Sequence, residues 1–310
     1  MTLADLPMPL MIAPCSNRKR PPPAIHAANL SGGATDAVGR EWLARLDQQA
    51  RQPALQLYCG RSVREAEQAA IGLDAELLFA SAGLGWISAS EHVPSYGMTI
   101  VAGKDNVLDL IEGGASAQAW WRWLNENSPF GTPLADAVAR TDGLVIVALP
   151  RAYLAMVEAD LLALPKRQRD RLRIIQRPSS LRPKLQTWTL TYDDRLEAGD
   201  AWSGTRADFA PRAARHFVER VLPSHPNADA HKHEQAVQTA LAAWTAAPAR
   251  IGARRSDDEL RQVVRRHWDE AGGRTTRLLR ILRDDLEIAC EQGRFARLVS
   301  MMRAERLSPQ

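Results

Sequence analysis

The sequence has few cysteines, few lysines and no long apolar segment, and each of these absences excludes a class of protein. Cys15, Cys59 and Cys290 lie far apart and are odd in number, so they predict neither a disulfide framework nor a zinc-binding spacing. No apolar run approaches the roughly 20 residues of a membrane span, and the N-terminus lacks the basic region and apolar core of a signal peptide. We therefore expect a cytoplasmic protein without a membrane partner, a metal or another cofactor, and without an obligatory protein partner.

Arginine supplies nearly all of the positive charge. Lysine occurs only five times in 310 residues, and the formal net charge is +4. Because arginine binds phosphate bidentately and stacks on bases, this bias favours a nucleic-acid partner. A genome rich in G and C would produce the same bias, so composition alone leaves both explanations open.

Short apolar runs alternate with amphipathic stretches through the first two thirds of the chain. We expect strands at 10–15, 55–58, 77–81, 143–149 and 173–176, and an edge strand within 185–190. Helices are expected at 36–51, 62–72, 115–126 and from about residue 153. This alternation predicts an α/β domain over residues 1–222, with a mostly parallel sheet and helices on both faces.

The proline-containing segment 222–232 predicts a linker to a second, all-helical domain at 233–310. Ser256 and Glu259 form a capping-box pattern that opens a helix ending near Gly272. Further helices are expected from Thr275 or Thr276 and at 289–304. Residues 251–310 hold 13 arginines against 10 acidic residues. Three short helices with a tight turn before the last resemble a helix-turn-helix, and a small helical bundle is the alternative.

The most informative segment is the one that follows the first expected strand. Cys15, Ser16, Asn17 and Lys19 come directly after an apolar run, and ligands bind where parallel strands end. Ser16 and Asn17 could hydrogen-bond a base edge. Lys19 could act as a cation, or as a nucleophile if burial depresses its pKa. The alternative is an ordinary surface lysine beside a small core cysteine.

The segment around residues 192–195 is a second candidate, because Asp193 and Asp194 stand between Tyr192 and Arg195. A carboxylate there could orient a water molecule or stabilise a cationic transition state. Neighbouring strand residues point to opposite faces, so only one of the two is expected to face a pocket. A solvated turn is the alternative.

The loop after the expected strand 77–81 is a third candidate. Ser81 and Gly83 lie where backbone could approach a ligand closely, and Tyr96 could stack on a base. An ordinary flexible loop is the alternative.

Several arginines are expected to bind a nucleic-acid backbone. They are Arg206, Arg212, Arg215, Arg277, Arg294 and Arg297. Solvated helix faces are the alternative for these arginines.

The pattern Pro14-Cys15-Ser16-x-x-Lys19 resembles the Pro-Cys-Ser-x-x-Lys motif of archaeosine synthase, and the resemblance covers about residues 8–220. It implies a fold similar to that of uracil-DNA glycosylases, with a base pocket at the strand ends. Three further segments resemble bacterial proteins of deazaguanine modification and phage defence, including the glycosylases that excise glucosylated hydroxymethylcytosine. These segments contain Tyr58 with Arg61, Ser81 with Gly83, and Tyr192 to Arg195.

The resemblance and the motifs together lead us to expect a DNA glycosylase that removes a modified base from phage duplex DNA. Asp193 or Asp194 would stabilise the sugar cation, with Lys19 also in the catalytic set. The substrate-binding residues would be Cys15, Ser16, Asn17, Tyr58, Arg61, Ser81, Gly83, Tyr96, Tyr192 and Arg195. A transferase acting on a 7-deazaguanine base, with Lys19 as nucleophile, and a non-catalytic DNA-binding adaptor are the alternatives.

Overall fold

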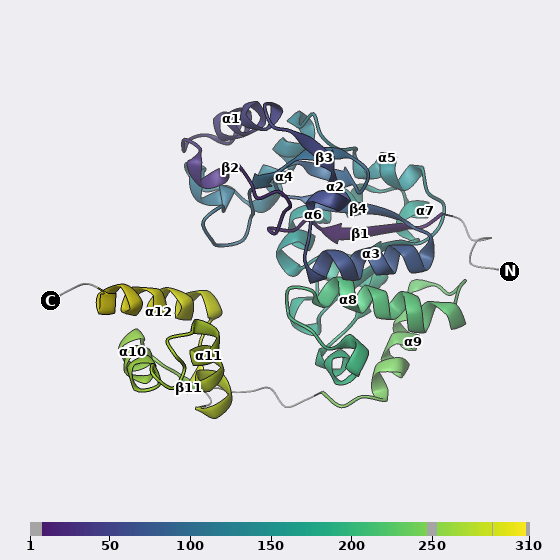
Figure 1. The fold of residues 1–310 in the computed structure, drawn as a ribbon. Helices are drawn as coiled ribbons and strands as arrows, with labels where there is room; N and C mark the ends of the chain where they lie inside the picture. The colour runs from purple at the N-terminus through teal and green to yellow at the C-terminus, as the bar shows by residue number, and fades with distance from the viewer. Residues whose placement is uncertain (1–7, 247–252, 287, 308–310) are drawn as a thin grey trace. The chain divides into compact units, whose positions relative to one another are not determined.

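The computed structural model describes residues 8–246, 253–286 and 288–307, and the chain divides into two compact units, 1–247 and 248–310 (Figure 1). The first unit is an α/β domain built on a six-stranded sheet. In the second unit the described residues form three α-helices and two short strands, so the all-helical domain expected from the sequence is not observed.

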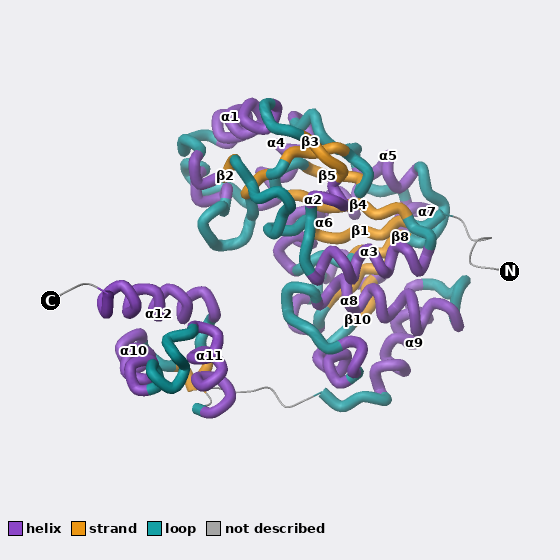
Figure 2. The backbone as a smooth tube through the Cα atoms, in the orientation of Figure 1, coloured by secondary structure: helices purple, strands orange, loops and turns teal. Residues whose placement is uncertain are grey.

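Five parallel strands and one antiparallel edge strand form the sheet of the first unit (Figure 2). The spatial order is β10 (Thr189–Thr191), β9 (Leu172–Gln176), β8 (Val145–Val147), β1 (Leu10–Pro14), β4 (Glu76–Ser81) and β5 (Gly85–Ser88). Every residue of β1, β8 and β9 is buried, as expected for parallel strands covered on both faces. The expected mostly parallel sheet is therefore confirmed.

Helices cover both faces of this sheet because later strands are added on both sides of β1. The chain first crosses to β4 on one side and later returns to β8 on the other side of β1. Since such crossovers are right-handed, the two directions place helices on opposite faces. The helix α3 (Arg61–Leu73) packs on β1 and β4, next to α8 (Phe209–His216), whereas α6 (Arg151–Ala163) packs with α4 (Ala117–Asn127) on the other face.

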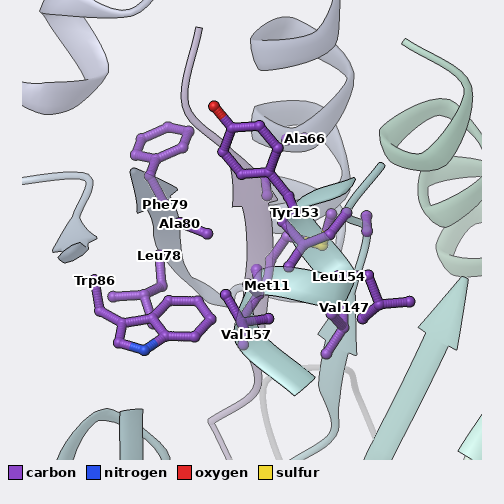
Figure 3. Packing of buried hydrophobic residues seen from close by; sticks show 14 of the residues in the cluster. Met11, Ala66, Leu78, Phe79, Ala80, Trp86, Val147, Tyr153, Leu154 and Val157 are labelled. Carbon is purple, nitrogen blue, oxygen red and sulfur yellow. The ribbon is translucent and has the colours of Figure 1, made fainter. Parts of the chain in front are cut away.

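The amphipathic pattern of α3 shows why these helices form where they do. Val63, Ala66, Ala70 and Leu73 recur at helical spacing and are all buried. The core on the α6 face contains Met11, Leu154 and Val157 among apolar neighbours (Figure 3). The remaining helices are α1 (Thr35–Asp47), α2 (Ala54–Leu57), α5 (Leu134–Ala139), α7 (Lys166–Arg169) and α9 (Ala230–Ala242). Two small strand pairs complete the unit, β2 (Ile25–His26) with β7 (Tyr96–Gly97) and β3 (Arg51–Pro53) with β6 (His92–Pro94).

Two expected strands are wrong in whole or in part. Residues 54–57 form the one-turn helix α2, in which Tyr58 N–H donates to the Ala54 carbonyl; a short apolar run fits either structure. Within 185–190, the 3₁₀ helix η5 (Pro183–Trp188) precedes the edge strand. Only residues 189–191 pair with β9, because the residues just before them are coiled in the 3₁₀ helix.

The expected domain boundary at 222–232 is also wrong, because the division falls between residues 247 and 248. Helix α9, expected in the second domain, packs on β10, and its Val237 and Leu241 belong to the core of the first unit. Gln238 of α9 donates to the Thr191 carbonyl at 2.7 Å. The prolines of 222–232 therefore mark a turn within the domain.

The second unit has its own core around Leu260, Leu282, Phe295 and Val299. Its helices are α10 (Asp257–Arg266), α11 (Thr275–Arg280) and α12 (Gln292–Leu307). The capping box of Ser256 and Glu259 is present. Before α12 the chain forms β12 (Ile288–Ala289), paired with β11 (Ala253–Arg254), so the last helix begins at Gln292 and not near residue 289 as expected. The turn expected near residues 285–287 falls partly on residue 287, which lies outside the described residues.

Candidate active site

The Cys15–Lys19 segment begins at the carboxyl end of β1, as the sequence predicted. This point is the switch in strand order between β1 and β8, where open α/β sheets bind ligands. Cys15 Sγ lies 3.7 Å from the hydroxyl of Tyr153 on α6, and Figure 3 shows that hydroxyl directed away from the apolar side chains. Ser16 Oγ donates to the Cys59 carbonyl at 2.7 Å, while Asn17 is exposed.

Lys19 is buried, with 7% of its surface exposed. Its Nζ donates to the Ser16 carbonyl at 2.7 Å and lies 4.1 Å from the centre of the Tyr96 ring. Burial lowers the pKa of Lys19, although the nearby Cys15 and Asp105 act in the opposite direction. A desolvated amine of this kind is a better nucleophile near neutral pH than an exposed lysine.

The aromatic residues beneath Lys19 are part of the core. Tyr58 and Tyr96 are almost fully buried, and their hydroxyls lie 2.8 Å apart. Ser81 is buried against the Tyr96 hydroxyl, and a Cβ on Gly83 would lie 2.7 Å from the Tyr96 ring. Gly83 is therefore needed for close packing, and the expectation that Tyr96 stacks on a base is wrong for this conformation.

A cavity of about 230 Å³ opens at the carboxyl ends of β8 and β9. Leu149, Leu154, Ile175 and Phe209 give it apolar walls. Its polar and charged lining residues are Arg151, Gln176, Arg177, Ser179, Ser180 and Arg206. Apolar walls with a few polar groups are typical of small-ligand sites.

The two aspartates that follow β10 have different environments. Asp193 accepts hydrogen bonds from both the backbone N–H and Nε of Arg195, each at 2.9 Å, and these bonds lower its pKa. Asp194 has 62% of its side chain exposed and lies 2.8 Å from Arg177, which lines the cavity. Asp194 is therefore linked to the cavity through its ion pair with Arg177, although neither aspartate is part of the lining.

The Cys15–Lys19 and Asp193–Asp194 segments lie at one edge of the sheet but line different places. Strands β8 and β9 separate β1 from β10, so the strand ends are about 14 Å apart at the usual strand spacing. Neither segment belongs to the lining of the cavity between them. The side chains of Tyr192 and Arg195 do not reach it either: Tyr192 is buried against His216, and Arg195 bonds Asp193 and Gln238.

Most arginines of the first unit that we expected to bind DNA are occupied within the protein. Arg212 is fully buried between Glu197 and Asp208, so the DNA-binding expectation is wrong for it. Arg215 bonds Glu65 at 2.8 Å. Arg61, expected to bind substrate, pairs with Glu65 and Asp208. Arg206, by contrast, is exposed and lines the cavity.

The arginines of the second unit are placed differently from one another. Arg277 and Arg297 are exposed, and no ion pair is formed by either within the described ranges. Arg294 pairs with Asp257 and donates to the Arg255 carbonyl at 3.1 Å. Arg277 and Arg297 thus stay available to a phosphate backbone.

Arg151 and Arg177 are site residues that our reading of the sequence missed. Each comes within a few residues of the end of a buried strand, β8 for Arg151 and β9 for Arg177. The rule that singled out Cys15, namely polar residues directly after a strand, would also have found Arg177, whereas Arg151 follows β8 only after Ala148, Leu149 and Pro150.

Comparison with known proteins gives no match to a family model, a curated protein or a solved structure. Within residues 8–246, 253–286 and 288–307, no helix has both the length and the apolar character needed to cross a bilayer. No group of three or more His, Cys, Asp or Glu side chains in these same ranges could hold a metal ion.

Proposed function

We propose that this protein is a DNA glycosylase that flips a modified base into the cavity at the ends of β8 and β9 and hydrolyses its N-glycosidic bond. The observation that carries the proposal is the 2.8 Å ion pair between Asp194 and the cavity residue Arg177. It brings a solvent-accessible carboxylate to a base-sized hollow that also presents arginines.

The walls of the cavity suit a flipped base. Leu149, Leu154 and Ile175 offer apolar surface for a flat ring, and Ser179 and Ser180 offer hydroxyls for its polar edge. Flipping costs a few kcal/mol in lost stacking and pairing. Contacts between arginines and the phosphate backbone would offset that cost.

Asp194 is the carboxylate that we assign to catalysis. Loss of the base leaves positive charge on the sugar, and a nearby carboxylate stabilises this charge and orients the attacking water. Asp193 accepts hydrogen bonds from the backbone N–H and the side chain of Arg195, so we assign it a structural role in stabilising the turn. This assignment replaces the choice between two aspartates that the sequence left open.

The test uses duplex DNA that carries glucosylated hydroxymethylcytosine, followed by alkali cleavage of abasic sites. The wild-type protein should produce strand breaks at the modified positions. Asp194→Asn should remove at least a hundredfold of the rate, since charge stabilisation in a transition state is worth about 3 kcal/mol or more. Asp136→Asn, which changes an exposed aspartate on α5, is the matched control and should cleave like wild type. Equal cleavage by Asp194→Asn would refute the assignment.

The burial of Lys19 favours a second candidate function, a transferase that acts on a 7-deazaguanine base in tRNA or DNA. In it, the amine with lowered pKa would attack the substrate. Incubation with a deazaguanine nitrile and intact-protein mass spectrometry would detect an adduct. Lys19→Arg should lose the adduct and Lys104→Arg, at an exposed position, should keep it. An unmodified wild-type protein would reject this candidate.

A further inference from the structure

Three arginines from separate parts of the first unit meet at the cavity. Arg151 begins α6, Arg177 follows β9, and Arg206 lies in the loop before α8. Among the described residues, Asp194 is the one carboxylate that pairs with any of them, through Arg177. Arg151 and Arg206 form no ion pair within that part of the chain. The cavity therefore gathers more positive than negative charge.

The surrounding structure positions the side chain of Arg177 and the backbone of the loop that carries Arg206. The guanidinium of Arg177 lies 3.8 Å from the centre of the Phe209 ring, which is buried. In the loop that carries Arg206, the backbone N–H groups of Gly204 and Thr205 donate to Glu197 and Asp208, each at 2.8 Å. Like charges that are held close together repel each other unless an anion lies between them.

The chemistry of this cluster fits a phosphate group. Guanidinium groups bind phosphate oxygens through paired N–H donors. The first turn of α6 adds backbone N–H groups without helical partners on the same side, since Pro150 and Arg151 line the cavity. The carboxylate of Asp194 would compete with a phosphate for Arg177.

We propose that Arg151, Arg177 and Arg206 form a phosphate subsite, that it binds a phosphodiester beside the flipped nucleotide, and that this phosphate competes with Asp194 for Arg177. The identity of the ligand as DNA rests on the proposed function. Binding of the phosphate would release Asp194 from its ion pair at the time when the sugar is in place.

The experiment measures affinity of the full chain for a short unmodified fluorescein-labelled duplex by anisotropy over a range of salt concentrations. Arg151→Gln and Arg206→Gln should each bind several-fold more weakly, with a salt slope reduced by about 1. Asp194→Asn should bind several-fold more tightly. The control Arg140→Gln, an exposed arginine at the end of α5, should bind like wild type. Wild-type affinity in Arg151→Gln and Arg206→Gln would overturn the binding of DNA at these arginines, and wild-type affinity in Asp194→Asn would overturn the competition at Arg177.

A second arm identifies the source of the phosphate. The melting temperature of the protein is measured in inorganic phosphate and in chloride at equal ionic strength. Suppose that phosphate raises the melting temperature more than chloride does, and that Arg151→Gln and Arg206→Gln abolish this rise but keep wild-type DNA affinity. The subsite then binds a free phosphate compound. That result overturns the DNA part of the proposal.

Base release, measured separately, distinguishes failure of this inference from failure of the proposed function. If the arginine variants lose DNA affinity but the wild-type protein releases no base, the subsite stands and the glycosylase assignment falls. If wild type and both arginine variants release base with the same KM, the glycosylase stands and the subsite falls.

Discussion

Arg177 and Asp194 form an ion pair of 2.8 Å that joins the segment after β9 to the segment after β10. The same guanidinium packs on the ring of Phe209 at the start of α8. One arginine thus links two strand ends and a helix at the edge of the sheet where the cavity opens. The contacts of the residues around Arg177 allow predictions of how mutations should affect stability and binding.

Asp193 and Asp194 should differ in their effect on stability. Asp193→Asn weakens the bonds to Arg195 and should lower the free energy of unfolding by about 1 kcal/mol. Asp194→Asn breaks only a solvent-accessible pair and should stay within about 0.5 kcal/mol of wild type. Urea denaturation measures both values. The opposite order would contradict the separate roles given to the two aspartates.

Arg212 should behave as a structural residue. Arg212→Met removes the buried cation between Asp208 and Glu197 and leaves the buried Asp208 with only the partly exposed Arg61, so the free energy of unfolding should fall by about 3 kcal/mol. Arg206→Met changes an exposed cavity residue and should alter it by less than about 0.5 kcal/mol. Equal stability of the two variants in urea melts would show that the buried network contributes little.

Two buried histidines should make the protein less stable in acid. Burial lowers the pKa of His216 and of His233 to about 4. His233 Nδ1 accepts a hydrogen bond from Arg173 at 2.7 Å, and the positive charge of Arg173 also disfavours its protonation. His216 is enclosed by Tyr192, Trp202 and Trp244, and the charge of Arg220 acts in the same direction.

The sign follows from proton binding to the unfolded chain. A histidine in the unfolded chain takes up a proton as the pH falls below about 6.5, whereas these two histidines in the folded protein do so only near pH 4. The free energy of unfolding is therefore highest above about pH 6.5 and decreases as the pH falls from about 6.5 to about 4. Each histidine should contribute a loss of up to about 3 kcal/mol. Urea melts at pH 7 and pH 5 measure the slope. His216→Gln should flatten it, and His92→Gln, at an exposed position, should leave it unchanged; an equal slope in all three proteins would contradict the account.

The second unit should contribute to DNA affinity through its exposed arginines. Arg277→Gln and Arg297→Gln should each weaken duplex binding and lower the salt slope by about 1, with the free energy of unfolding almost unchanged. Anisotropy titrations at several salt concentrations measure the effect. If both variants keep wild-type affinity, these arginines form only a solvated surface.

The sequence was sufficient to predict the central strands, because β1 and β8 lie in short continuous apolar runs that stop at a proline; the expected strand 143–149 was longer than β8, which covers residues 145–147. It was not sufficient for residues 54–57, where the apolar pattern fits a helix or a strand and contacts with the carbonyls of Ala89 and Glu91 determine the outcome. The place of α9 was also not predictable, since it depends on packing against β10, far away in the sequence.

For the candidate site, too, the sequence predicted what depends on local pattern and failed where contacts with distant segments decide the structure. Cys15 and Asp194 are at the sheet edge where their positions after strands predicted them. The burial of Arg212 and Tyr96 could not be predicted, because the partners that enclose them come from distant segments. Nor could a local pattern show that the cavity lies between the two candidate segments, on the ends of β8 and β9.

The most direct test of the central claim is mass spectrometry of the small molecules released from duplex DNA that carries glucosylated hydroxymethylcytosine. The account predicts that wild-type protein and Asp136→Asn release the free modified base and that Asp194→Asn does not. Release of base by Asp194→Asn at the wild-type rate, or no release by the wild-type protein, would contradict it.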